Sequence, residues 1–179
     1  VGIIGSSKLA QSQLEAVCTV RSIEQVRVFS PNPEHAQKCA EEMSGKGPVP
    51  DNVRPVSSSK KAINNADIVC TATTSNTPVI AFENLKQGVH INAVGAFKPE
   101  MQDIAGETIV NAVVVADSRE SVLAEAGDIV IPINQGLISK DHVHAEIGEL
   151  INRAKTGRTS AYQITLFLSL IHISEPTRR

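Results

Sequence analysis

The chain has 179 residues, which is enough for one domain with a hydrophobic core but too few for a typical two-domain enzyme. Apolar residues make up 41% and charged residues 20%, a soluble globular composition, and no stretch approaches the roughly 18 apolar residues of a membrane span. The formal net charge of −2 and the 3% of aromatic residues supply neither a positive field nor stacking surfaces, so we expect no nucleic acid and no membrane among its partners.

Strand-length apolar runs alternate with helical patterns along the chain, as they do in βαβ units. Strands are predicted at residues 1–5, 26–29, 53–56, 66–73, 89–94 and 113–115. Helices are predicted over about 9–20, 33–44, 59–65, 118–126 and 144–154, followed by a last amphipathic helix that ends near residue 168. Asn32 and Pro33 mark the start of the second helix as an N-cap and a first-turn proline. The alternation predicts an α/β fold of the Rossmann type, a mostly parallel sheet with helices on both faces.

The two ends of the chain differ from those of an ordinary domain. Val1 already lies in the first predicted strand, so we expect that the chain starts inside a longer protein. Residues 169–179 do not continue the pattern before them and look like translated sequencing-adapter DNA. We therefore expect one native domain over residues 1–168 and a non-native tail over residues 169–179.

The cysteines bear on the compartment. Cys18, Cys39 and Cys70 lie in predicted helices or strands, and they form no CxxC pair. This arrangement is typical of reduced, mostly buried thiols, so we expect a cytoplasmic protein.

The turn after the first strand, Gly5-Ser6-Ser7-Lys8-Leu9-Ala10, has the outline of the dinucleotide fingerprint G-x-G-x-x-G/A. Its first glycine and last small residue are present, and Ser7 replaces the middle glycine, through which the backbone approaches the pyrophosphate. An ordinary βα turn is the alternative, but a position between a strand and a helix N-terminus favours phosphate binding. We expect the Ser7 side chain to weaken cofactor binding.

The second strand ends in Ser30-Pro31-Asn32, with no acidic residue to bind ribose hydroxyls as in NAD-type sites. This favours NADP, although no arginine is present for the 2′-phosphate, and Ser30 and Asn32 would supply neutral hydrogen bonds. Alternatively, both residues cap the following helix.

Several further segments follow the first turn in a characteristic order. They are Ala66-Asp67-Ile68-Val69-Cys70-Thr71-Ala72-Thr73, Gly88-Val89-His90-Ile91-Asn92-Ala93-Val94-Gly95-Ala96, Asp117-Ser118-Arg119-Glu120, Glu125-Ala126-Gly127-Asp128, Gly157-Arg158-Thr159-Ser160 and Ile164-Thr165-Leu166-Phe167. The ordered set resembles the ornithine cyclodeaminase/μ-crystallin family from residue 1 to about residue 169. The resemblance implies a two-domain, usually homodimeric enzyme whose N-terminal part binds substrate and dimerises, while this C-terminal part binds NAD or NADP. We expect that N-terminal half to lie outside this sequence.

The resemblance also implies where the cofactor lies. Lys8 and Leu9 would lie by the pyrophosphate, together with Gly5, Ser6 and Ser7 of the same fingerprint turn. Ser30 would lie at the adenosine ribose and Thr71 or Thr73 beside the cofactor. The nicotinamide would meet Asn92, Ala93, Val94, Gly95 and the late serine Ser169. True cyclodeaminases of the family carry an acid/base aspartate two residues after that glycine, where this chain has Phe97. Because a phenyl ring cannot transfer protons, the catalytic residues stay unknown.

The histidines and the other aspartates of the sequence are not assigned to the cofactor site. His142 and His144 form an H-x-H pair, but no cysteine or carboxylate cluster completes a ligand set, so we expect no metal site. His90 lies within a predicted strand of alternating pattern, and it is interpreted as a structural residue and not as a general base. Asp117 and Asp128 are interpreted as a helix cap and a turn residue.

Three functions are compatible with these features. The resemblance implies an ornithine cyclodeaminase-like lyase, which converts L-ornithine to L-proline and ammonia by internal hydride transfer to and from bound NAD. An NAD(P)H-dependent imine (ketimine) reductase or an alanine dehydrogenase is the second hypothesis, and Phe97 favours it. A non-catalytic NAD(P)-binding protein is the third. In either enzyme the partner is a small amino or imino acid, and we expect this chain alone to be catalytically silent because the substrate-binding half is missing.

Overall fold

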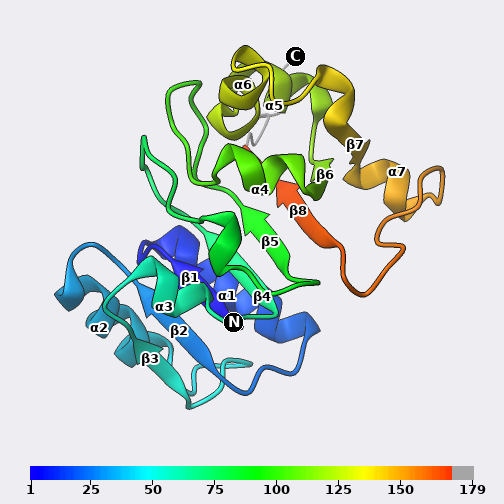
Figure 1. The fold of residues 1–179 in the computed structure, drawn as a ribbon. Coiled ribbons are helices and arrows are strands. Elements are labelled where there is room, and N and C mark those ends of the chain that lie inside the picture. The colour runs from blue at the N-terminus through cyan, green and yellow to red at the C-terminus, as the bar shows by residue number, and fades with distance from the viewer. Residues whose placement is uncertain (171–179) are drawn as a thin grey trace, which may run out of the picture.

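The computed structural model describes residues 1–170 of the chain. Within them, parallel strands form one eight-stranded sheet in the order β3-β2-β1-β4-β5-β8-β6-β7. The strands are β1 (Gly2–Ile4), β2 (Val26–Phe29), β3 (Val53–Pro55), β4 (Ile68–Thr71), β5 (His90–Ala93), β6 (Ala112–Ala116), β7 (Val143–Glu146) and β8 (Ile164–Leu168). The α/β fold of the Rossmann type predicted from the sequence is therefore confirmed (Figure 1).

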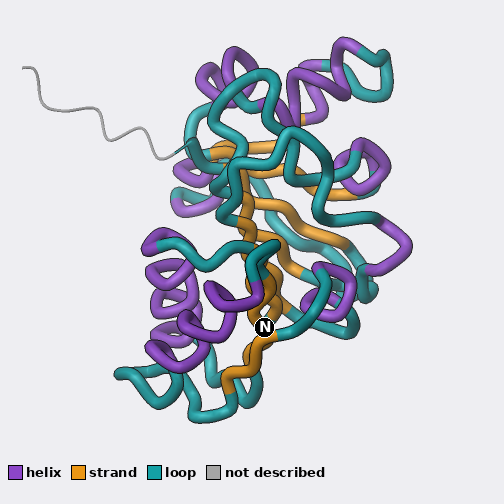
Figure 2. Tube along the Cα trace, turned by 90° about the vertical axis from the view of Figure 1, so that its left-hand side faces the viewer, coloured by secondary structure: helices purple, strands orange, loops and turns teal. Residues whose placement is uncertain are grey.

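Helices cover both faces of this sheet, as Figure 2 shows. One face is covered by α1 (Lys8–Val20) and α2 (Pro33–Met43). The other is covered by α3 (Ser59–Ile63), α4 (Gly106–Val110), α5 (Arg119–Glu125) and α6 (Gly127–Asn134). The short helix α7 (Ile147–Ile151) follows β7, and two single turns, η1 (Phe82–Asn84) and η2 (Lys140–His142), lie in connections. No helix among the described residues is long and apolar enough to span a bilayer.

Two hydrophobic cores lie on the two faces of the sheet because successive strand residues point in opposite directions. Ile3 packs toward α1, where it meets Leu14, whereas Ile4 packs on the other face with Ile63 of α3. Each of these side chains is about 1% exposed, so both faces of β1 are buried. Burial on both sides explains why this strand reads as a continuous apolar run.

Several helices begin close to the predicted positions because the side chains of their capping residues accept hydrogen bonds from main-chain N–H groups of the first turn. The side chain of Asn32 accepts a hydrogen bond from the N–H of Glu34 at 2.9 Å, and Pro33 occupies the first turn of α2. The Ser118 hydroxyl, rather than the Asp117 carboxyl, caps α5 by accepting from the N–H of Ser121. The interpretation of Asp117 as the cap is thus corrected by one residue.

Two predicted helices are wrong. The segment expected to end a helix near Leu168 is strand β8, which lies between β5 and β6 and pairs Leu166 with Ile91 on one side and Val114 on the other. Side-chain burial alternates along Ile164–Leu168, as it does in a strand. An apolar run of only five residues fits a strand and one face of a helix equally well, so its sequence does not separate the two. The predicted helix over 144–154 begins as β7, and only Ile147–Ile151 is helical.

The end of the described chain continues the packed domain past the predicted boundary at residue 168. The N–H of Ser169 donates to the carbonyl of Ala93 at 3.1 Å, its hydroxyl donates to Asp117 at 2.8 Å, and Leu170 is 7% exposed. Residues 169 and 170 therefore belong structurally with the sheet. The expected non-native origin of residues 171–179 concerns positions outside the described part of the chain.

Candidate dinucleotide-binding site

A cleft of about 580 Å³ opens at the carboxyl edge of the sheet, above β1, β2, β4 and β5. Helix α1 follows β1 on one face and α3 precedes β4 on the other, so the chain reverses its direction of winding between these two neighbouring strands. Ligands of open α/β sheets bind at this switch point. The cleft is lined by Ile4, Gly5, Ser6, Ser7, Leu9, Phe29, Pro31, Ala72, Thr73, Thr74, Ser75, Val79, Val94, Gly95, Phe97 and Leu170.

The first turn forms one wall of the cleft, and Gly5 is required for its shape. Its φ of 110° lies in the region that side chains rarely adopt, and a Cβ there would lie 2.5 Å from the carbonyl oxygen of Ala72. The N–H of Gly5 donates to the carbonyl of Phe29 at 2.9 Å, which holds the turn against the end of β2. Gly5 therefore has the tight-turn role expected of the first fingerprint glycine.

Ser7 closes this turn as the N-cap of α1. Its φ of −69° is accessible to any residue, and its hydroxyl accepts a hydrogen bond from the N–H of Ala10 at 3.4 Å. The start of the thirteen-residue helix thus borders the cleft, with Ser6, Ser7 and Leu9 in its lining. A helix N-terminus offers N–H groups and a positive dipole end to a phosphate.

The side next to β2 is built by Phe29 and Pro31, which line the cleft, while Ser30 between them is 7% exposed and is not in the lining. The Asn32 side chain is engaged in capping α2. Lys8 lies on the outer side of the turn, in a smaller neighbouring hollow that also contains His35 and Lys38. Its ammonium group lies 3.6 Å from the Glu42 carboxylate.

The opposite wall is formed where the chain leaves β4 and β5. Thr73, Thr74 and Ser75 come from the first exit, and Val94, Gly95 and Phe97 from the second. A Cβ at Gly95 would collide with the backbone of Thr73, so the two exits touch. The Phe97 ring is 42% exposed and lies 5.9 Å from the Lys98 ammonium nitrogen.

Behind this wall lie two buried carboxyl groups that sequence reasoning did not assign to the site. An Asp103 oxygen accepts a hydrogen bond from the Thr73 hydroxyl at 2.5 Å, and Oδ1 of Asp128 accepts from the N–H groups of Asp103 and Ile104, each at 2.8 Å. Burial raises the pKa of Asp128 to about 8. It also raises the pKa of Asp103, against the opposing effect of the Thr73 hydroxyl. The interpretation of Asp128 as a turn residue is wrong, since it lies fully buried in the first turn of α6.

Four other expected cofactor contacts lie away from the cleft lining. Thr71 is fully buried, and Ala93 packs in the core under α3 to α6. Ser169 binds Asp117. The Asn92 side chain projects from the α1 side of the sheet into a separate hollow.

His90 lies in the same hollow as Asn92. One ring nitrogen is 2.8 Å from the Thr165 hydroxyl and the other is 3.2 Å from the side-chain oxygen Oδ1 of Asn92. Burial lowers the pKa of His90, so it favours the neutral ring. These contacts favour the interpretation of His90 as a structural residue of the sheet.

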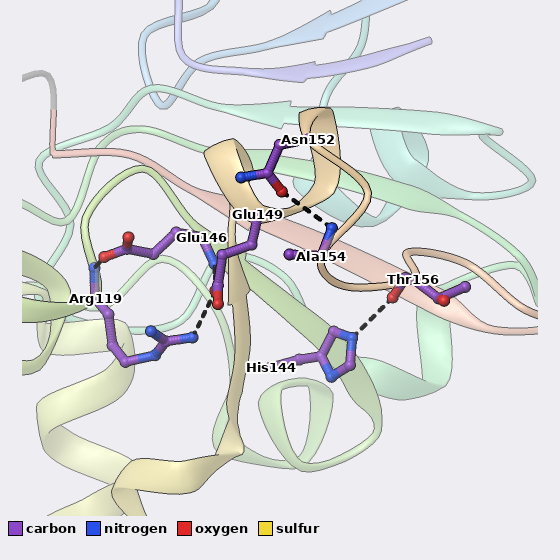
Figure 3. A network of polar contacts seen from close by, with 7 residues as sticks. All are labelled: Arg119, His144, Glu146, Glu149, Asn152, Ala154 and Thr156. Carbon is purple, nitrogen blue, oxygen red and sulfur yellow. Dashed lines mark hydrogen bonds and ion pairs between the residues drawn. The ribbon is translucent and has the colours of Figure 1, made fainter.

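The H-x-H pair lies near the far edge of the sheet, where Figure 3 shows His144. His144 lies 2.8 Å from the carbonyl oxygen of Thr156, and His142 lies 2.7 Å from that of Ile109. The neighbouring Glu146 accepts from the main chain of Arg119 and Glu149 from its guanidinium, which joins α5 to the start of α7. Within residues 1–170, no group of three or more His, Cys, Asp or Glu side chains is arranged to hold a metal ion.

A parallel sheet with a glycine turn, a helix N-terminus and a cleft at its switch point defines a Rossmann-type domain of the dinucleotide-binding class. The sequence pattern of the ornithine cyclodeaminase/mu-crystallin family matches residues 1–171. The chain belongs to this family, as the resemblance implied.

Relatives and solved structures agree with this assignment. The chain is 41% identical over 169 residues to a Δ1-pyrroline-2-carboxylate reductase of Bacillus cereus, covering 94% of this chain and 51% of the relative. It is 34% identical over 168 residues to the ketimine reductase mu-crystallin of Mus musculus, covering 94% and 49%. The Thermococcus litoralis Δ1-pyrroline-2-carboxylate reductase, solved with NADH and L-proline, superimposes with a TM-score of 0.90 at 41% identity over 94% of this chain and 52% of that one. The chain thus spans about half the length of these relatives.

Proposed function

We propose that this chain is the NAD(P)H-binding part of an imine reductase that acts on a small cyclic imino acid of the pyrroline-2-carboxylate class. The observation that carries the proposal is Phe97 in the cleft wall, at the position where the family resemblance places the proton-transferring aspartate of a cyclodeaminase. The reductases among its relatives support the same choice. The second of the three hypotheses from the sequence is thereby preferred to the cyclodeaminase.

The residues of the cleft fit a dinucleotide. The N-terminus of α1 and the Gly5 turn would bind the pyrophosphate through main-chain N–H groups. Phe29 and Pro31 would lie against the adenosine, and the end of β2 carries no carboxylate to repel a 2′-phosphate, so we propose that NADPH is accepted as well as NADH. Gly95, which packs directly against the Thr73 backbone, would border the nicotinamide. Ser30 and Asn92 would act indirectly, by shaping the ends of β2 and β5.

The reaction sets a requirement that the chain does not meet alone. A bound reduced nicotinamide would supply a hydride to the imine carbon, and the nitrogen of the C=N bond must gain a proton to give the amine. The described residues that line the cleft include hydroxyl groups but no carboxyl, imidazole or ammonium group. Phe97 instead presents an apolar side chain to the cleft, which would reduce the contact of a bound nicotinamide with water. We propose that the proton donor, the substrate carboxylate site and the homodimer contact come from the remaining half of the parent protein, in the cytoplasm.

A fusion tests this proposal. Joining the chain to the complementary half of the Bacillus cereus relative should give a protein that oxidises NADH with Δ1-pyrroline-2-carboxylate and releases no ammonia from ornithine with NAD⁺. A Phe97→Asp fusion is the matched control, because it restores the carboxyl expected of a cyclodeaminase. The chain without its partner half should bind NADH and turn over neither substrate.

Other results would select another function. Ammonia release by the unaltered fusion without net change in nicotinamide absorbance would identify a cyclodeaminase and refute the proposal. NAD⁺ reduction with alanine would identify an alanine dehydrogenase. NADH binding by a folded fusion without turnover of any amino or imino acid would favour a non-catalytic binding protein.

A further inference from the structure

Asp103 lies between the two exits that form the nicotinamide end of the cleft. One oxygen accepts the hydrogen bond from Thr73, and the other faces Gly95 so closely that a Cβ on this glycine would collide with it. The second oxygen makes no hydrogen bond of ordinary geometry, although the buried Thr71 hydroxyl lies near enough to lower the pKa of this carboxyl group. The Asp103 side chain is fully buried, and burying a carboxyl group with so few partners is costly, so its position between these walls calls for a physical explanation.

A second contact leaves the Thr73 hydroxyl free to donate to Asp103. The Thr73 hydroxyl oxygen accepts from the N–H of Ser75 at 3.0 Å, so its single hydrogen is free to point to Asp103. The N–H of Gln102 donates to the carbonyl of Ser75 at 2.9 Å. Both ends of the Thr73–Ser75 segment are therefore attached to the segment that carries Asp103.

The backbone of Asp103 is itself held from three sides. Its N–H donates to Asp128, and its carbonyl accepts from the N–H groups of Val79 at 2.8 Å and Ile80 at 3.1 Å. Asp128 is buried in α6 and also binds the N–H of Ile104. This arrangement leaves Asp103 little freedom to move away from the cleft wall.

We propose that Asp103, held in place by Asp128, is a positioning residue that fixes the Thr73–Ser75 segment against Gly95 and so sets the width of the nicotinamide end of the cleft. The inference rests on the proposed function, since it concerns the same cofactor. Asp103 is absent from the cleft lining and acts through Thr73. The first-turn end of the cleft is built without it.

Two probes separate positioning from general stability. NADH reaches both ends of the cleft, whereas ADP-ribose lacks the nicotinamide and needs only the end built by α1 and β2. Asp103→Ala should raise the Kd of NADH by about tenfold and change that of ADP-ribose by less than about twofold. Asp103→Asn keeps an oxygen that can accept from Thr73 and should restore NADH binding.

Thr73→Val and Thr108→Val complete the experiment. Thr73→Val removes the same hydrogen bond from the other side and should also weaken NADH selectively. Because Thr73 itself lines the cleft, the comparison of Asp103→Ala with Asp103→Asn decides the positioning role. Thr108 is another fully buried side chain with an unpaired hydroxyl, but it lies on α4, so Thr108→Val should change neither affinity. If the folded Asp103 and Thr73 variants lose equal affinity for NADH and ADP-ribose, or lose no affinity for either ligand, the positioning role alone is overturned. Failure of the unaltered chain to bind either probe would instead overturn the proposed function, and this inference with it.

Discussion

The walls at the two ends of the cleft differ in structure. Where β1 meets α1, the wall is main chain, a glycine turn followed by the first turn of a helix. Where the chain leaves β4 and β5, the wall consists of loop segments that the buried carboxyl groups of Asp103 and Asp128 hold from behind. A main-chain wall contains no titratable group, whereas a buried carboxyl group changes its charge with pH. We therefore expect the first end to respond to steric changes and the second to changes in charge and hydrogen bonding.

Gly5→Val should have the largest effect, because it breaks the main-chain end. The new side chain would need a left-handed φ and would collide with the carbonyl of Ala72, so NADH affinity should fall by about a hundredfold or more. Binding is measured by titrating the nicotinamide fluorescence. Gly148→Ala is the control, since an added Cβ meets nothing within 4 Å there, and it should leave binding unchanged. Undiminished binding by Gly5→Val would place the cofactor elsewhere.

Asp128→Ala should damage the loop end strongly. It leaves the N–H groups of Asp103 and Ile104 buried without their acceptor, which should lower the free energy of unfolding by about 2 to 4 kcal/mol. Urea unfolding measures this loss. In the folded fraction, ADP-ribose binding should survive better than NADH binding. An equal decline in both affinities would show that the two ends are not independent.

The raised pKa of Asp128 predicts that the free energy of unfolding depends on pH. Burial raises its pKa to about 8 from the ordinary 3.8, so the folded protein holds the proton more tightly than the unfolded chain. The stability contributed by this group is fully present below about pH 4 and is lost as the pH rises through about 8. Asp128→Asn cannot titrate and keeps an acceptor for both N–H groups. Its free energy of unfolding should therefore fall less than that of the unaltered chain between about pH 5 and about pH 9; parallel falls would contradict the assignment.

Ser7→Gly should have the smallest effect, and it probes the first end without breaking it. Removing the side chain should tighten NADH binding by about 1 kcal/mol if the serine only crowds the phosphate. The loss of the α1 cap should cost only a few tenths of a kcal/mol of stability. A titration that shows unchanged or weaker binding would mean that this turn does not contact the pyrophosphate.

The same difference between the two ends explains what could be predicted from the sequence. The first turn is contiguous in the chain, so its strand, its glycine and its helix start were all recognisable. Asp103 and Asp128 come from separate segments, and their partners lie 24 to 30 residues away. An isolated acidic residue near a helix looks the same whether it faces solvent or is buried, so no local signal identified these two.

Strand geometry accounts for the other differences. The family resemblance assigned the whole run from Asn92 to Gly95 to the nicotinamide, but successive strand residues point to opposite faces, and only Val94 and Gly95 reach the carboxyl edge. Strand β8 was missed because its partners Ile91 and Val114 lie far away in sequence. A short apolar run gives no information about which strands will flank it.

The most direct test of the account is to follow the backbone amide signals of the 19.1 kDa chain by NMR during titration with NADH and, separately, with ADP-ribose. We predict that NADH shifts the signals of Ser7 to Leu9 and of Thr73 to Ser75, and that ADP-ribose shifts only those of Ser7 to Leu9. Shifts confined to the hollow around His90 and Arg158, or no shifts with either ligand, would contradict the claim that this cleft binds the dinucleotide.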